Sequence, residues 1–319
     1  MKFKIDKFVL SIITIVGIAY FFPQWGSSQS EIPLDTISDI GISLIFLFYG
    51  LKLSPQKIKS GLKNWKLHLL VQTATFLIFP LLVLFFRPFL QTEEQELLWL
   101  AFFFLAALPS TVSSSVVMVS MAKGNVPAAI FNASISGIIG IVLTPIWMGL
   151  FVQEAQSGFQ FTEIYIKLVF QIILPVVVGL SLQRFLGGMV QKYGSQLALF
   201  DKAIILLIIY KSFARSFEEQ IFSTVSILDL MIIGVAVLGL FVLAYLLTGF
   251  VAEKLRFNTE DQITAQYCGT KKSLVHGTVF SKILFGKMAT LGVILLPLMI
   301  YHAFQILVIS VLATKRGNR

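Results

Sequence analysis

Charged residues are scarce in this sequence: they make up 13% of its 319 residues, while hydrophobic residues make up 56%. A soluble globular domain carries about 25% charged residues, so the composition excludes an ordinary soluble protein. The sequence contains one cysteine, Cys268, which excludes a disulfide bond within the chain. No cluster of cysteine and histidine indicates a structural metal, and we expect no resident cofactor.

Acidic side chains are missing from the centres of the long apolar runs. Asp39, Glu163 and Asp229 lie near the ends of such runs. A carrier of sodium or protons usually holds a carboxylate at that depth, so a bound sodium ion is not expected here. The sequence also lacks a Gly-x-Ser-x-Gly elbow, a His-Glu-x-x-His motif and a pair of carboxylates within a run. These absences argue against an enzyme.

Long hydrophobic runs dominate what is present. Each run has the length that about 30 Å of hydrocarbon requires of a helix, and the connections between runs are short. We therefore predict an all-α polytopic membrane protein. The first run is interpreted as a span and not as a signal peptide, because no small-residue cleavage site follows it. Hydropathy predicts ten transmembrane helices, over residues 8–25, 34–53, 68–89, 97–122, 126–151, 164–184, 201–218, 229–252, 262–285 and 288–313.

The net charge of +9 indicates membrane topology and not nucleic-acid binding, because cytoplasmic loops are rich in lysine and arginine. If the N-terminus is cytoplasmic, 17 of the 25 lysines and arginines fall on the inner side, six fall outside and two lie within a span. We predict an integral protein of a bacterial inner membrane, with both termini in the cytoplasm and lipid around it. The sequence does not indicate an oligomeric state.

Ten spans divide into two sets of five, at about residues 1–155 and 156–319. An odd number of spans in each set makes the second set enter from the opposite side, as in the inverted repeats of secondary transporters. Two stretches support such a repeat: Ser114–Lys123 in the fourth span and Ser273–Lys282 in the ninth each begin with serine and end with lysine. We predict one transporter unit, residues 1–319, built from two inverted five-helix repeats.

The fourth and ninth spans are interrupted at matching positions. Pro109 precedes a cluster of hydroxyl residues in the fourth span, and Gly269 precedes two lysines in the ninth. Irregular backbone at membrane depth requires surrounding protein or a wet cavity, and paired interrupted helices are typical of a transport site. The candidate substrate- or ion-binding residues are Gln72, Ser113, Ser114, Ser115, Asn132, Ser134, Tyr267, Thr270, Lys271, Lys272, Ser273 and His276.

Each of these residues also has a structural interpretation. The serines could form a packing face between helices, and Gln72, Asn132, Ser134 and His276 could make ordinary hydrogen bonds within the bundle. The lysines are harder to explain in this way, because one lysine at a helix centre costs about 2.5–3.5 kcal/mol on insertion scales. We predict that Lys271 or Lys272 lines a water-accessible cavity that attracts an anion; a solvated structural face is the alternative.

The interrupted segments resemble those of the bile acid:sodium symporter family. Pro109–Asn125, Ala128–Ser134 and Leu143–Pro145 are similar to its fourth and fifth helices, and Gly269–Ser273 takes the place of its ninth-helix motif. The resemblance covers nearly the whole chain. It implies a panel domain (spans 1, 2, 6 and 7), a core domain (spans 3–5 and 8–10) in which broken helices cross, and sodium-coupled uptake of organic anions by alternating access.

The resemblance also reveals departures at the family's sodium ligands. Tyr267 stands where the family has glutamate, Lys271 where it has glutamine and Lys272 where it has asparagine. Fixed ammonium groups would repel sodium at short range, and the sequence is similar to a divergent branch whose vertebrate member is tied to calcium handling. We predict a secondary transporter of a small organic anion, not coupled to sodium, in which a lysine replaces the ion. A conventional sodium-coupled symporter, or a membrane regulator of calcium homeostasis without substantial flux, are the alternatives.

Overall fold

A computed structural model describes residues 7–26, 33–53, 64–89, 91–111, 113–155, 166–220, 226–286, 288 and 290–318. Helix is the regular secondary structure throughout these ranges, as predicted. The chain forms two compact units, each assembled from three stretches. Unit 1 comprises Met1–Pro55, Gly158–Ser226 and Thr278–Leu295, and unit 2 comprises Gln56–Ser157, Ile227–Gly277 and Leu296–Arg319. The panel and core domains remain a prediction.

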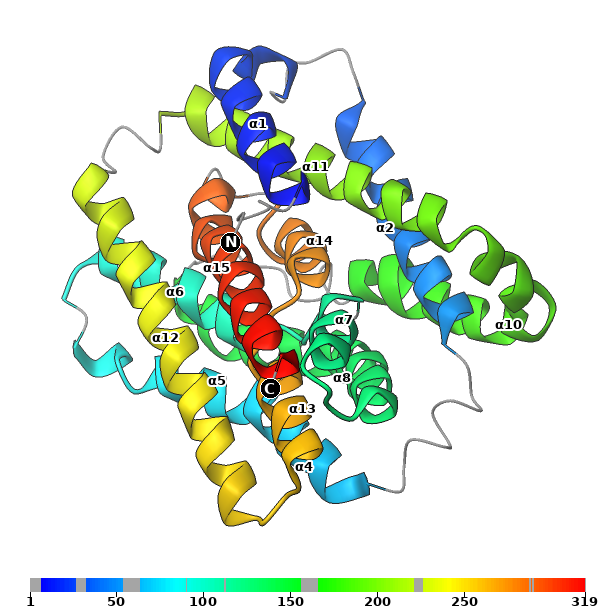
Figure 1. Ribbon diagram of the computed structural model, residues 1–319. Coiled ribbons are helices and arrows are strands. Elements are labelled where there is room, and N and C mark those ends of the chain that lie inside the picture. The colour runs from blue at the N-terminus through cyan, green and yellow to red at the C-terminus, as the bar shows by residue number, and fades with distance from the viewer. Residues whose placement is uncertain are drawn as a thin grey trace. The chain divides into compact units, whose positions relative to one another are not determined.

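Unit 1 is built around a few long helices. Helix α1 packs along α11, and α2 contacts both α10 and α11 (Figure 1). Two of the predicted spans extend further than their hydropathy indicated: α10 and α11 are separated by Tyr193 alone, because a helix can continue past the apolar run that it contains. The elements are α1 (Lys7–Phe21), η1 (Pro23–Trp25), α2 (Leu34–Lys52), η5 (Val169–Ile173), α10 (Leu174–Lys192) and α11 (Gly194–Glu218).

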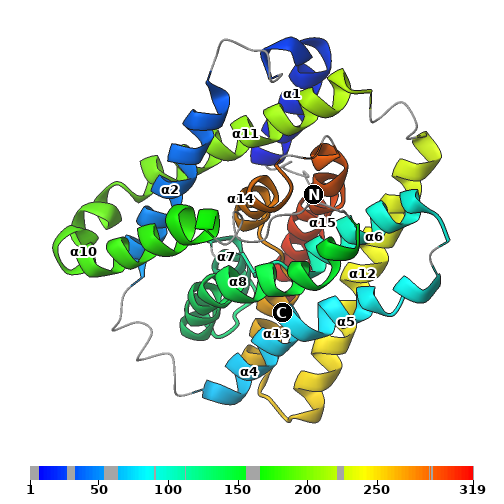
Figure 2. The same ribbon diagram turned by 180° about the vertical axis from the view of Figure 1, so that it is seen from behind.

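Unit 2 contains the interrupted segments. Helix α12 lies along α4 and α13, and α8 packs on α6 and α7 (Figure 2). Its elements are α4 (Trp65–Thr73), η3 (Ala74–Ile78), α5 (Phe79–Leu84), η4 (Arg87–Phe89), α6 (Glu93–Ala107), α7 (Ser113–Met121), α8 (Val126–Ala155), α12 (Ile227–Lys254) and α13 (Thr259–Gly269). Helices α14 (Leu274–Phe285) and α15 (Leu291–Gly317) each have residues in both units.

Six helical segments are long and apolar enough to cross a membrane by length and composition: Leu34–Lys52, Trp65–Phe89, Val126–Phe151, Ile166–Lys192, Ile227–Lys254 and Leu291–Gly317. The predicted fourth and ninth spans are each divided into two shorter helices, and α1 is a shorter apolar helix. Side chains such as Met231, Val235 and Leu246 on α12 are 60–72% exposed, which suits lipid and not water. The number of ten spans and the inverted repeat remain predictions.

Two glycines allow α2 and α10 to touch. A Cβ atom added to Gly50 would lie 3.1 Å from the Cα atom of Gly179, and one added to Gly179 would lie 3.0 Å from the Cα atom of Gly50. The atoms in the way belong to the backbone, so they cannot move aside as a flexible side chain could. Small residues at such a crossing let helix backbones pack closely in a membrane.

We expect Gly50→Ala to destabilise the protein by about 1–3 kcal/mol through overpacking. The measurement is thermal unfolding of purified protein in detergent. Gly234→Ala on α12 is the matched control, because no heavy atom lies within 4 Å of its added Cβ; it should leave the melting temperature unchanged or raise it slightly. Equal melting temperatures for the two variants would show that the α2–α10 crossing is looser than described.

Candidate functional site

The two interrupted helices meet within unit 2. Between α6 and α7, and between α13 and α14, the chain leaves the helical conformation at Pro109 and after Gly269. The backbone amide of Ser273 donates to the carbonyl of Pro109 at 2.8 Å. The hydroxyl of Ser110 donates to the carbonyl of Cys268 at 2.6 Å. At each interruption, a backbone carbonyl that lacks a helical partner therefore accepts a hydrogen bond from a residue of the other interruption.

Lys272 lies at the centre of this crossing and has no solvent exposure. Its ammonium donates to three backbone carbonyls, those of Thr75 at 2.7 Å, Ala106 at 2.6 Å and Leu108 at 2.9 Å. The ring centroid of Phe79 lies 4.3 Å from the same nitrogen, close enough for a cation–π interaction. Since an ammonium has three donors, this shell satisfies all of them.

The carbonyls of Ala106 and Leu108 are free because α6 ends there. The last carbonyls of a helix lack intrahelical donors and carry the negative end of the helix dipole. Thr144 supplies one missing donor, since its hydroxyl bonds to the carbonyl of Ala107 at 2.7 Å. Lys272 supplies two more, so a cation occupies the position that the helix end favours.

The carbonyl of Thr75 is free for a different reason. It lies in the π-helical segment η3, where the amide of Phe79 bonds to Ala74, five residues back. The next residue, Pro80, has no N–H, so neither residue donates to Thr75. The adjacent carbonyl of Phe76 accepts from the indole of Trp147 at 2.9 Å. A single π-helical turn often lies at a functional site, and here it supplies one ligand of the ammonium.

Gln305 of α15 fixes the backbone of Lys272. Its side-chain oxygen accepts from the Lys272 amide at 2.8 Å, and its side-chain nitrogen donates to the Lys272 carbonyl at 2.8 Å. In addition, the hydroxyl of Tyr301 donates to the carbonyl of Thr270 at 2.5 Å. Both ends of the non-helical segment are thereby attached to α15, which prevents it from slipping along the crossing.

Lys271 has a contrasting environment. It is equally buried, with no exposed area, yet among the residues that the structure describes its ammonium has no hydrogen-bond partner. Cys268, also buried, lies in the last turn of α13, three residues before Lys271. Burying an unpaired charge is costly, so Lys271 is the group at this site that would gain from an anionic partner.

The serines of the fourth predicted span gather around Thr111. The Thr111 hydroxyl lies 2.9 Å from the hydroxyl of Ser114 and 2.8 Å from that of Ser115, at the start of α7. The side chain of Ser113 lies outside the described residues. These hydroxyls are thus grouped at a helix N-terminus next to Ser110, but no hydrogen bond joins Ser114 or Ser115 to either lysine ammonium in the described part of the chain.

Gln72, Asn132 and Ser134 lie on neighbouring helices. The side-chain nitrogen of Gln72 donates to the side-chain oxygen of Asn132 at 3.2 Å, and the Asn132 side chain donates to the carbonyl of Ala128 at 3.0 Å. Ser134 bonds to the carbonyl of Ile130 in its own helix at 2.9 Å. These are hydrogen bonds of the kind that the structural interpretation expects, and a binding role for the three residues stays a prediction.

The remaining candidates lie on both sides of the lysines. The Thr270 hydroxyl donates back to the carbonyl of Gln266 at 2.5 Å, and the ring of Tyr267 has the guanidinium of Arg316 5.6 Å from its centroid. Ser273 caps α14: its hydroxyl accepts from the His276 amide at 3.3 Å and lies 2.9 Å from the His276 ring nitrogen. Of the predicted residues, Lys272 and Ser273 are those in direct contact with the other break.

Sequence reasoning missed four polar groups of unit 2. The Thr75 and Ala106 carbonyls belong to the backbone and have no sequence signature, but Gln305 was visible as a lone amide in an apolar run. Asp261 was also missed. It is 7% exposed, and its carboxylate accepts from the side-chain amides of Asn64 and Asn125 at 2.8 Å each. Within the described ranges, no group of three acidic, histidine or cysteine residues could hold a metal ion.

We expect replacement of the two lysines by methionine to have opposite effects on the stability of the protein. Lys272→Met leaves three buried carbonyls without donors, and we expect a loss of about 3–5 kcal/mol. Lys271→Met removes an unpaired buried charge, and we expect an unchanged or higher stability. Thermal unfolding of ligand-free protein in detergent measures both. Equal losses in the two variants would contradict the different roles assigned to them.

Comparison with known proteins identifies the chain. The sequence model of the SBF-like CPA transporter family matches residues 6–317. The chain is 38% identical to "Uncharacterized protein PA2026" of Pseudomonas aeruginosa, over 100% of this chain and 95% of that protein. It is 35% identical to "Putative symporter YfeH" of Escherichia coli, over 98% of this chain and 92% of the relative. It is 31% identical to "Sodium/bile acid cotransporter 7" of Xenopus tropicalis, over 98% and 91%.

These matches confirm the resemblance found in the interrupted segments, and they agree with the apolar helices of an integral membrane protein. The family is one of transporters, and two of these relatives carry the names of a symporter and a cotransporter, which confirms the prediction that the protein is not an enzyme. The chain belongs to the SBF-like CPA transporter family and is a secondary transporter.

Proposed function

We propose that this protein carries a small organic anion across the membrane by alternating access, without sodium, and that the Lys272 ammonium takes the place of a coupling ion. The observation that carries the proposal is the shell of three carbonyls around the Lys272 nitrogen, at 2.6–2.9 Å. Backbone carbonyls at the end of a broken helix are the groups with which transporters coordinate sodium. Here a tethered cation already satisfies them.

A sodium ion added to this shell would have to displace the ammonium or lie beside it. Two unit charges a few ångströms apart repel each other by several kcal/mol even at the intermediate dielectric of a protein. Among the residues that the structure describes, the lysine shell also contains no carboxylate that could offset a second positive charge. These facts support transport that is independent of sodium.

Lys271 is the proposed partner of the substrate. Its ammonium is buried and unpaired in the described part of the chain, so an anionic group that reached it would replace a costly state by an ion pair. A neutral hydrogen-bond acceptor would gain less there than a carboxylate or another anionic group. The proposal therefore assigns the two adjacent lysines different tasks: Lys272 holds the crossing together, and Lys271 selects for an anion.

The proposed architecture follows the prediction from the sequence. Ten spans form two inverted repeats, with a panel domain of spans 1, 2, 6 and 7 and a core domain of spans 3–5 and 8–10 that contains the interrupted helices. Both termini lie in the cytoplasm of a bacterial cell, and the protein resides in the inner membrane. The division of the chain into two units that interleave in sequence supports this plan.

Sodium-coupled symport is the second candidate, and the names of the vertebrate relatives favour it. A regulator of calcium homeostasis without substantial flux is the third. Counterflow in proteoliposomes distinguishes a carrier from such a regulator. A carrier exchanges a bound anion across the membrane, and a regulator binds it without exchange.

We expect an organic anion that stabilises the purified protein to do so equally in sodium and in potassium buffers. Bound ligand raises the melting temperature according to its concentration relative to its dissociation constant. A screen of mono- and dicarboxylates, sulfonates and bile acids by thermal shift, with each cation in turn, measures this. A hit that requires sodium would overturn the tethered-cation proposal and favour the second candidate.

The matched variants are Lys271→Met and Lys254→Met. The first should abolish the stabilisation by the anion found in the screen, while the second removes an exposed lysine at the end of α12 and should preserve it. If every anion that stabilises the native protein stabilises Lys271→Met as strongly, these anions bind elsewhere and the role assigned to Lys271 is wrong.

The orientation is tested by cysteine labelling after Cys268 is replaced by alanine. Glu94→Cys lies in the segment predicted outside, and Lys254→Cys lies in one predicted inside; both native residues are exposed. A membrane-impermeant maleimide should label the first in intact spheroplasts and the second only after the membrane is permeabilised. The reverse pattern would invert the predicted topology.

A further inference from the structure

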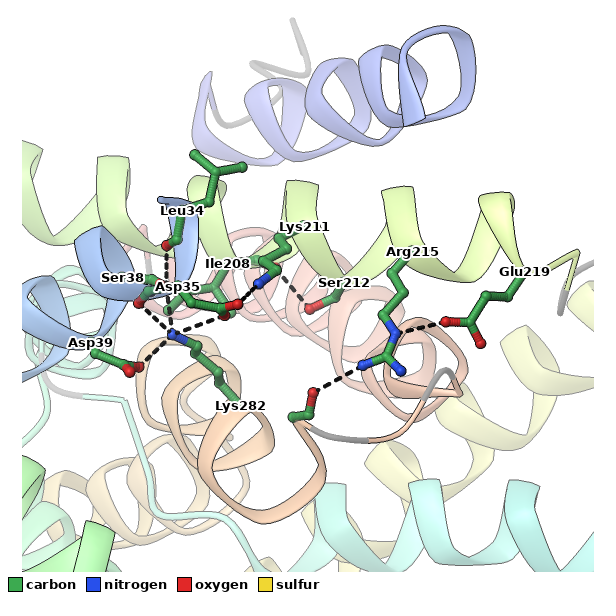
Figure 3. Close-up of polar contacts among 11 residues, drawn as sticks. Leu34, Asp35, Ser38, Asp39, Ile208, Lys211, Ser212, Arg215, Glu219 and Lys282 are labelled. Atoms are coloured by element: carbon green, nitrogen blue, oxygen red, sulfur yellow. Dashed lines mark hydrogen bonds and ion pairs between the residues drawn. The ribbon is translucent and has the colours of Figure 1, made fainter. Parts of the chain in front are cut away.

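Unit 1 contains a charged pocket that the lysine crossing does not use. It lies between the first turns of α2, the second half of α11 and the C-terminal end of α14, and it is lined by three cationic side chains, Lys211, Arg215 and Lys282, together with Asp35, Ser38 and Ser212. Figure 3 shows the Asp35 carboxylate between the ammonium groups of Lys211 and Lys282. Three positive charges and one negative charge thus line the pocket.

Two of the cations, Lys282 and Arg215, have partners other than the Asp35 carboxylate. The side chain of Lys282 is 11% exposed, and its ammonium contacts the Asp39 carboxylate, the Ser38 hydroxyl at 2.5 Å and the Asp35 backbone carbonyl at 3.0 Å. Arg215 is fixed by Glu219 at 2.8 Å and by the carbonyl of Gly286 at 3.3 Å. These contacts do not involve the Asp35 carboxylate, so they hold Lys282 and Arg215 in place when it leaves.

The Asp35 carboxylate is different, because it is 66% exposed while its partner Lys211 is 20% exposed. An exposed carboxylate contributes about 0–1 kcal/mol through its ion pairs, so it can leave the pocket at little cost. Its departure would leave the Lys211 ammonium without its carboxylate, while Arg215 and Lys282 stay paired with Glu219 and Asp39. Asp35 also lies in the first turn of α2, where the helix dipole favours any negative group.

We propose that this pocket is a binding site for a small carboxylate, and that Asp35 occupies it as an internal substitute for that ligand. The incoming carboxylate displaces Asp35 and pairs with Lys211, while Lys282 keeps its own three partners. The site belongs wholly to unit 1 and does not depend on the transport proposed above. A purely structural ion-pair cluster is the competing explanation, and the two differ in what happens when the internal carboxylate is removed.

The test measures succinate binding to purified full-length protein from the dependence of the melting temperature on succinate concentration, in a low-chloride buffer. Asp35→Asn removes the competitor, so we expect a lower melting temperature without succinate and about fivefold tighter succinate binding. Lys211→Met should weaken binding by at least about tenfold, because a charge-assisted contact is lost. A structural cluster would instead show a lower melting temperature in Asp35→Asn with no gain in affinity.

Asp201→Asn is the matched control. Asp201 of α11 pairs with Lys52 of α2 at 3.4 Å. The variant therefore removes a carboxylate that joins the same two helices at a different place, and succinate affinity should not change. Equal affinities in the native protein, Asp35→Asn and Lys211→Met would overturn the proposal. If Asp35→Asn does not yield folded protein, unchanged binding in Lys211→Met alone is sufficient to reject it.

One further variant separates this site from the crossing of the broken helices. Lys271→Met should retain succinate binding if the pocket in unit 1 is responsible. Binding that is lost in Lys271→Met and kept in Lys211→Met would place the carboxylate at Lys271; the pocket proposal would fail and the proposed function would stand. Binding lost in Lys211→Met and kept in Lys271→Met would support the pocket proposal and leave the proposed function unaffected.

Discussion

Three backbone carbonyls around one buried ammonium are the contact on which the candidate site depends. Without the Lys272 nitrogen, the end of α6 and the π-helical turn η3 would each present unsatisfied carbonyls in the protein interior, and each such group costs about 1–3 kcal/mol. The irregular backbone between α13 and α14 is tolerated because it places this cation there. The break and the cation therefore explain each other, and neither would be stable alone.

Much of this arrangement follows from the sequence. Pro109 and Gly269 predicted the two interruptions. Two lysines within an apolar run predicted a polar site with one lysine facing a water-accessible cavity, but in the structure both lysines are fully buried. The different environments of Lys271 and Lys272 could not be predicted, because which of two adjacent side chains enters a carbonyl shell depends on tertiary packing. The shell itself consists of backbone atoms. Pro80 does remove an N–H from η3, but that effect points to Thr75 only when the π-helical register is known.

The same comparison holds for the charged residues of unit 1. Lys211, Arg215 and Lys282 entered the sequence argument as topological markers, counted by side of the membrane and not by neighbour. Folding brings them to one pocket from two helices that are far apart in the chain. Asp39 was set aside because it lies near the end of a span, although its carboxylate pairs with Lys282 there. Counting charges on each side of the membrane predicts the orientation of the chain, but it does not predict which charged side chains lie close together.

A cation that is part of the chain has a consequence for energetics that a bound ion does not have. It contributes its charge without the loss of translational freedom that a free ion incurs on binding, and its occupancy does not vary with ion concentration. For the same reason it cannot transfer the energy of an ion gradient to the substrate, since it never leaves the protein. If Lys272 takes the place of sodium, an uncoupled carrier would move its anion down the anion's own electrochemical gradient. With a cell interior at negative potential, that gradient favours export of an anion unless its external concentration is high.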